Sequence, residues 1–393
     1  MPILQAILHA LGTSFDMFWE VLWALALGFI LSAVVQSLVS RQAVAGALGN
    51  DSPRSLAIAC GLGAASSSCS YASVAIARSL FRKGATFVNA IVFEFASTNL
   101  VFELGLILLI LLGWQFLAAE FAGGLLMIVI LAFIFRLTLR RQLVEEAKSQ
   151  ADRGLLGKME GHGGMDMSVS GGSFLTRLLS GPGLTAVSHY FWMDVTALWL
   201  DIGLGLLIAG ALAAWVPNSF WQGFFLTGHP VIASIWGPLI GPVISLLSFV
   251  CSIGNVPLAA VLWNGGISFG GVIAFIFADL IIIPILNIYR KYYGARMSLY
   301  LLVVSYVAMA LSGFLIGLAF QGLGIAPAHR ALIALESSPT LNYTTILDVL
   351  FLAVIGLLGW RFLRTGGLDM LRMMEMPAES EINGGQSSHH HQH

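Results

Sequence analysis

Long apolar runs fill most of the chain and alternate with short polar connections. A helix needs about 20 apolar residues to cross a hydrocarbon core of about 30 Å, and its backbone groups must find their partners inside the segment. Nine runs meet this requirement clearly: 17–39, 55–78, 84–112, 116–139, 191–215, 238–262, 267–289, 297–321 and 343–363. The pattern predicts an all-α polytopic membrane protein.

The placement of Lys and Arg orients these spans, because cytoplasmic loops carry the excess of positive charge. Positive residues gather in four segments that we therefore expect inside: 78–83, 136–158, 290–296 and 361–372. Three loops lack them and are expected outside: 113–115, 216–230 and 263–266. A tenth crossing is then required between 191–215 and 238–262. The apolar stretch 219–238 supplies it, as a short span or as part of a re-entrant element, and both termini become cytoplasmic.

Composition excludes several classes of protein. Hydrophobic residues make up 58% of the chain and charged residues only 10%, with a net charge of -1, whereas soluble domains carry about 25% charged residues. There is no basic stripe for nucleic acid, and three cysteines are too few for a disulfide framework. Walker, zinc-protease and catalytic-triad motifs are absent from the sequence. We expect neither an enzyme nor a cofactor, and the expected partners are the lipid bilayer and a small-molecule or ion substrate.

An internal repeat connects two segments of the chain. The sequence that begins at Cys69 aligns without gaps on the sequence that begins 182 residues later, at Cys251. Among the identical pairs are Gly84 with Gly266, and charge places the first glycine inside and the second outside. The two copies are therefore expected to run in opposite directions, as in secondary transporters whose site lies at the midplane between inverted repeats.

This repeat predicts about ten transmembrane helices in an inverted five-plus-five arrangement. The expected divisions are a first membrane repeat (1–139), a cytoplasmic loop with a Gly/Met/His-rich segment (140–188), a second repeat with the final span (189–365) and a disordered cytoplasmic tail (366–393). Serine, glycine, asparagine and proline inside the repeated spans predict broken or re-entrant helices, since such backbone at membrane depth must line protein or a cavity.

The start of each copy supplies the candidate substrate-binding groups. They are Ser68, Cys69, Ser70 and Tyr71 in the first copy, and Cys251, Ser252 and Asn255 in the second. A single buried cysteine commonly acts as a small apolar residue. Recurrence at equivalent positions favours a functional pair for Cys69 and Cys251.

Carboxylates inside predicted spans are the candidates for proton coupling. A charge at the centre of a membrane helix costs about 2.5–3.5 kcal/mol on insertion scales. Asp279 is the repeat counterpart of Ser97, and Glu94 lies one helical turn before Ser97. We expect Glu94, Asp279 and Asp201 to carry protons; the alternative is a carboxylate that locks helix packing through a hydrogen bond or lies near the interface.

Methionine and histidine gather in the polar segments. His162, Met165 and Met167 lie in a Gly-rich stretch of the central loop, and the chain ends in SSHHHQH. Thioether and imidazole groups suit Cu(I) or another soft metal. The alternative is a flexible loop in which these residues have no role.

Four motifs then resemble a known family. CSYAS (69–73), RKGAT (82–86) and FEFASTN (93–99), echoed by CSIGNVPLA (251–259), resemble the bacterial predicted-permease family that includes the ArsP-type organoarsenical efflux permeases. The resemblance covers about 15–140 and 190–300. It implies an inner-membrane permease whose cysteine-bearing motifs handle a thiophilic solute such as a trivalent organoarsenical. The first motif has no second cysteine two residues on, and copper or another soft cation remains an open alternative.

The sequence therefore favours a proton-coupled secondary permease that exports a thiophilic metal or metalloid species. Two alternatives remain: an uptake permease for a sulfur-containing anion, and a membrane metal-delivery or assembly partner without transport. A second copy of the chain and a soluble metal carrier are the candidate protein partners.

Overall fold

The computed structural model describes residues 3–38, 48–66, 70–151, 167, 174–248, 252–327 and 343–375. Of these residues 88% are helical, and none forms a strand. The all-α prediction is confirmed for the described part of the chain.

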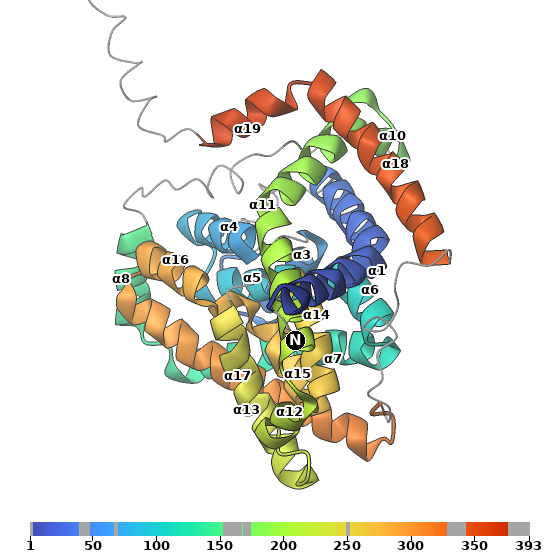
Figure 1. The fold of residues 1–393 in the computed structure, drawn as a ribbon. Helices are drawn as coiled ribbons and strands as arrows, with labels where there is room; N and C mark the ends of the chain where they lie inside the picture. Colours follow the sequence, from blue (N-terminus) through green and yellow to red (C-terminus); the bar gives the residue numbers. More distant parts are fainter. Residues whose placement is uncertain are drawn as a thin grey trace, which may run out of the picture.

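The first half contains eight described helices (Figure 1). They are α1 (Ile3–Leu38), α3 (Pro53–Ser66), α4 (Ser70–Arg82), α5 (Phe87–Asn99), α6 (Phe102–Leu111), α7 (Trp114–Thr138), α8 (Arg141–Ala151) and α10 (Phe174–Leu178). The second half begins with α11 (Gly181–Trp215), α12 (Asn218–Phe224), α13 (Pro230–Ser248), α14 (Ser252–Gly265) and α15 (Phe269–Phe277). It continues with the 3-10 helix η1 (Ala278–Ile281) and with α16 (Ile283–Tyr293), α17 (Ala295–Gly322), α18 (Tyr343–Arg364) and α19 (Gly367–Glu375).

Five helices in the described ranges are long and apolar enough to cross a membrane. They cover Phe87–Leu111, Trp114–Thr138, Pro230–Ser248, Ala295–Gly322 and Thr345–Arg364. A sixth span is obtained if Phe269–Ile281 and Ile283–Tyr293, which meet at 42°, are one broken crossing. The protein is a multi-pass membrane protein, and the larger count of ten stays a prediction.

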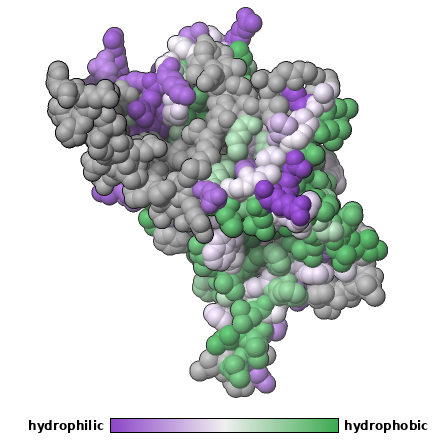
Figure 2. Space-filling model, turned by 90° about the horizontal axis from the view of Figure 1, so that it is seen from above, coloured by the Kyte–Doolittle hydropathy of each residue, from purple (hydrophilic) through white to green (hydrophobic). Residues whose placement is uncertain are grey.

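Lipid-facing stripes agree with this assignment. Leu125, Val129 and Phe133 of α7 are exposed and recur every four residues, which places them on one helix face. Leu299, Val303 and Val307 form the same stripe on α17. Hydrophobic side chains cover broad areas of the surface in Figure 2. An apolar outer surface of this kind suits contact with lipid tails rather than water.

Several predicted spans are broken where a single helix was expected. The span 84–112 is interrupted at Leu100 and Val101, where Val101 has extended backbone angles. The span 267–289 is interrupted at Ile282, which is also extended, and α16 restarts with Pro284 in its first turn. Proline tolerates that position because its missing N–H would have no helical partner there.

The predictions for 219–238 and for the following span were wrong in their boundaries. No single helix covers 219–238: α12 ends at Phe224, and Leu226 adopts a positive φ of 54°. Helix α13 starts at Pro230, and the predicted span 238–262 is divided between α13 and α14.

The polar segments also differ from the prediction. Helix α11 starts at Gly181, capped by the Ser180 hydroxyl, so its first residues belong to the segment expected as loop. Residues 367–375, expected in the disordered tail, form α19. Its apolar side chains pack near the end of α18, where Met370 is buried beside Phe362, and this burial stabilises a short helix that sequence alone leaves marginal.

The helix pattern of the first half recurs in the second. Helices α3 to α7 and the elements α13 to α17 follow one another with boundaries displaced by about 182 residues. The turn before α5 has Gly84 at φ 108° and a Thr86 cap, and the turn before α15 has Gly266 at φ 107° and a Ser268 cap. Each cap hydroxyl accepts a 3.2 Å bond from a backbone N–H three residues on. Equivalent sequence therefore builds the same local turn twice.

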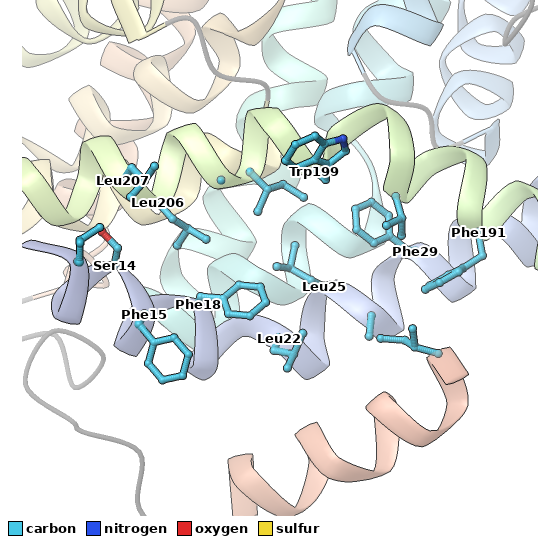
Figure 3. A pocket seen from close by; sticks show the side chains of 16 residues that line it. Ser14, Phe15, Phe18, Leu22, Leu25, Phe29, Phe191, Trp199, Leu206 and Leu207 are labelled. Carbon is cyan, nitrogen blue, oxygen red and sulfur yellow. The ribbon is translucent and has the colours of Figure 1, made fainter. Parts of the chain in front are cut away.

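Helices α1 and α11 pack along each other and border an apolar pocket of about 520 Å³. Figure 3 shows side chains from both helices around it, including Phe18, Leu25 and Leu206.

In Figure 1 the start and the end of α1 run in different directions. Within α1 the backbone N–H of Trp23 donates a 2.9 Å hydrogen bond to Asp348 Oδ1 of α18. A side chain that enters the helical ladder in this way is a recognised cause of a bend.

Candidate functional site

A buried hydrogen bond joins the first copy of the repeat to the second. Ser70 Oγ donates to Asp279 Oδ2 over 2.7 Å, and both residues are 0% exposed. Ser70 is the first residue of α4, and Asp279 lies in η1. Hydrogen bonds to an ionised acceptor are about twice as strong as neutral ones. Two predicted site residues are thus brought into contact.

The break between α15 and α16 places irregular backbone beside the buried Asp279. Helix α15 tightens into η1 at Ala278, and the chain then becomes extended at Ile282. Irregular backbone inside a membrane is tolerated only where protein or a cavity satisfies it. Asp279, the last residue of AFIFAD (274–279), therefore lies at a polar break in an otherwise apolar span, and Pro284 follows five residues later.

Glu94 makes a second bond between the two halves. It lies on α5 and is 0% exposed, and its Oε1 accepts a hydrogen bond from the hydroxyl of Tyr289 on α16. Glu94 is also within electrostatic range of Asp279. One acid from the first half is thus held by a hydroxyl of the second, while Asp279 of the second half is held by Ser70 of the first.

A third carboxyl group, that of Glu120, lies near the same place. Glu120 is on α7, is 0% exposed, and has neither carboxyl oxygen hydrogen-bonded to any described residue. It is within electrostatic range of Asp279. Glu94, Glu120 and Asp279 therefore bring three acids from three elements into one buried region, which we call the acid cluster.

Aromatic side chains lead from the acid cluster to a buried arginine. The rings of Tyr289 and Tyr293 stack with centroids 6.2 Å apart. Arg78 lies over the ring of Tyr292 at 4.3 Å, and its Nη2 donates to the carbonyl of Ala151 over 2.8 Å. Arg78 is 0% exposed inside α4. It is therefore a buried helix residue rather than an exposed loop charge, and the side of the membrane on which it lies stays a prediction.

Asn255 does not join the acid cluster through a hydrogen bond of the described residues. Its Nδ2 donates to Ser245 Oγ over 3.1 Å, and its Oδ1 accepts from Ser248 Oγ over 3.1 Å. Both serines belong to α13, and Asn255 belongs to α14. This amide ties two consecutive helices of the second half together.

Several predicted site residues lie outside the described part of the chain. They are Ser68, Cys69, Cys251, His162 and Met165. Three more lie in described helices, but their side chains are not described: Tyr71, Ser252 and Asp201. The roles expected of these residues stay predictions.

Met167 is described and packs against the apolar cluster that contains Ala186 and Tyr190. Its backbone N–H donates to the Tyr190 hydroxyl over 2.8 Å. Within the described ranges, no group of three or more His, Cys, Asp or Glu side chains is arranged to hold a metal ion. For this methionine the described contacts are those of packing.

Sequence reasoning missed Glu120 and Tyr289. Glu120 carries the signal that singled out Glu94, because it is a carboxylate inside a predicted apolar span. Tyr289 carries no such signal, since a tyrosine near a membrane boundary is common. Its role depends on the packing of α16 against the first half, which a sequence pattern does not specify.

Comparison with known proteins identifies the family. The family model ArsP_1, described as predicted permease, matches residues 6–321. A protein of Mycobacterium tuberculosis (strain ATCC 25618 / H37Rv), named "Putative permease Rv2963", is 58% identical over 338 residues, which are 86% of this chain and 83% of that protein. No solved structure matches the chain. The chain thus belongs to the ArsP_1 family of predicted permeases.

Proposed function

We propose that this protein is an inner-membrane secondary permease that exports a thiophilic metal or metalloid species, with an organoarsenical or a copper-like soft cation as the substrate. Export is coupled to protons. Cys69 and Cys251 bind the solute in turn, and Glu94 and Asp279 carry the protons.

The observation that carries the proposal is the bond between Ser70 and Asp279. Ser70 directly follows Cys69 in the chain, so a residue adjacent to the expected thiol contacts the expected proton carrier. A carboxylate exchanges its hydrogen-bond partner when it is protonated, because it then becomes a donor. Protonation of Asp279 would therefore change the hydrogen bond to Ser70 at the start of α4.

The repeated helix pattern supports an inverted five-plus-five architecture of ten spans. A break recurs at equivalent places in the two halves, at Leu100–Val101 after α5 and at Ile282 after η1. Discontinuous helices from two inverted repeats commonly form the substrate site of secondary transporters. The reversed orientation of the second half, and the cytoplasmic location of both termini, belong to the proposal.

Transport into inverted membrane vesicles tests the proposal. With an imposed pH gradient, we expect accumulation of labelled methylarsenite or of Cu(I), and its loss in the double variant Cys69→Ser, Cys251→Ser. Cys60→Ser is the matched control, since Cys60 is partly buried in α3 and has no cysteine counterpart in the second half.

Asp279→Asn separates the two parts of the mechanism. It should abolish the response to the pH gradient while exchange of solute across the membrane at equal concentrations persists. Unchanged flux in the cysteine double variant for every soft solute would contradict the thiol site. Gradient-driven uptake of thiosulfate in the opposite direction would support the sulfur-anion alternative instead.

A further inference from the structure

Glu120 is the member of the acid cluster for which the sequence pattern predicted no role. It lies in the first half of α7, and Arg136 near the end is the other charged residue of this helix. One turn further on, a Cβ at Gly123 would lie 3.0 Å from Phe277 Cζ, and Ser312 Oγ donates to the Gly123 carbonyl over 2.7 Å. This face of α7 is thus packed against the α15–η1 break and against α17.

The surroundings of Glu120 disfavour its ionised form. Both carboxyl oxygens are buried without a hydrogen-bond donor in the described part of the chain, and an unpaired buried charge is strongly unfavourable. Asp279 of η1 is the ionisable group within its electrostatic range. The other helices packed on α7 carry Glu94 on α5, Glu103 on α6, and Arg296, Tyr300 and Tyr306 on α17.

Asp279 is in the opposite situation. Its Oδ2 accepts a 2.7 Å hydrogen bond from the Ser70 hydroxyl, which suits a carboxylate. Two neighbouring acids share their protons unequally when one has a hydroxyl donor and the other has none among the described residues. The pair is arranged with the proton on Glu120 and the negative charge on Asp279.

We propose that Glu120 is a second proton-carrying residue, which holds a proton in this conformation and exchanges it with Asp279 during transport. This inference rests on the proposed proton-coupled permease. When the proton leaves the Glu120 carboxyl group and joins Asp279, Glu120 becomes the carboxylate and Asp279 becomes neutral, so the charge of the pair is unchanged. Ser70 then loses its ionised acceptor, which links proton movement to the contact between the two halves.

Infrared spectroscopy of the purified full-length chain in phosphatidylcholine vesicles tests the protonation state without a substrate. A protonated carboxylic acid gives a carbonyl stretching band that shifts in heavy water. We expect this band in the wild type, its loss in Glu120→Gln, and its retention at a shifted frequency in Glu120→Asp. Glu145→Gln, which changes an exposed glutamate of α8, is the control and should leave the band unchanged.

A band of the same intensity in folded Glu120→Gln would overturn the proposal, because the proton would then belong to another residue. The count of protons moved per solute in vesicles with a pH-sensitive dye is the second readout, and it should fall in Glu120→Gln and recover in Glu120→Asp. Failure of the wild type to move any thiophilic solute would refute the proposed function, while the infrared result would still decide the state of Glu120.

Discussion

Ser70 and Asp279 are 209 positions apart in the chain and are joined by a 2.7 Å hydrogen bond in the protein interior. The bond from Tyr289 to Glu94 crosses between the halves in the opposite sense. Glu94 and Asp279 are therefore each held by a hydroxyl group from the other half of the protein. A change in the protonation of either acid alters a contact between the halves, which is what coupling of protons to alternating access requires.

Replacing Ser70 by alanine should weaken the contact between the halves. A hydrogen bond to a charged group contributes about 1.5–3 kcal/mol to stability, so Ser70→Ala should lower the thermal unfolding temperature in detergent and reduce gradient-driven transport. Ser73→Ala is the matched control, because its buried hydroxyl donates to the Ser70 carbonyl within α4. Equal losses in the two variants would show that the Ser70–Asp279 bond has no special weight.

Tyr289→Phe should slow transport while the protein still folds. The variant keeps the stacked ring beside Tyr293 but removes the hydroxyl that donates to Glu94. If the bond contributes about 1.4 kcal/mol, the equilibrium between the conformations that differ in it changes about tenfold. The vesicle assay measures the resulting rate. Tyr306→Phe, whose hydroxyl bonds to the Leu239 carbonyl near the surface, should retain the wild-type rate; a similar loss there would point to a general effect of hydroxyl removal.

The sequence was sufficient to predict Glu94 and Asp279, but not the tyrosine that holds Glu94. Glu94 and Asp279 are recognisable because a carboxylate in an apolar run is costly and needs a reason. The repeat further predicts that their segments belong together. Tyr289 is 195 residues from Glu94, and its contact depends on how α16 returns after the break at Ile282. Such long-range packing is set by the whole fold, and no local pattern encodes it.

The same limit applies to the helix boundaries. The length of an apolar run identifies a segment that can cross the membrane. A break such as Leu100–Val101 consists of apolar residues, so it leaves the hydropathy pattern unchanged. Arg78 shows the reverse case. A basic residue near a predicted helix end suggests a loop, yet Arg78 is buried because Tyr292 and the Ala151 carbonyl receive its guanidinium group.

Gly63→Ala should destabilise the first half. A Cβ at Gly63 would lie 2.4 Å from the Phe93 carbonyl oxygen and 2.8 Å from Ala96 Cβ, so α3 would be pushed away from α5. Overpacking of this kind costs about 1–3 kcal/mol, and it would also displace Glu94, which follows Phe93. Gly61→Ala lies on the same helix, where a Cβ meets nothing within 4 Å, and should be neutral or slightly stabilising in thermal unfolding. A neutral Gly63→Ala would contradict the close approach of α3 and α5.

Asp348→Ala should loosen the attachment of α18 to α1. Asp348 is 0% exposed, and its Oδ1 accepts a 2.9 Å hydrogen bond from the backbone N–H of Trp23 in α1. Nearby, Trp19 Nε1 donates to Thr345 Oγ1 over 3.3 Å. The outer face of α18 is exposed at Ile346, Val349 and Leu350.

Without Asp348 the Trp23 N–H loses its acceptor, which costs about 1–3 kcal/mol when the group stays buried. Asp348→Asn keeps an amide oxygen at the same place and should preserve most of the stability, so the two variants separate the acceptor from the charge. Thermal unfolding in detergent measures both. If Asn and Ala destabilise the protein equally, the charge of Asp348 rather than the acceptor oxygen holds α18 against α1.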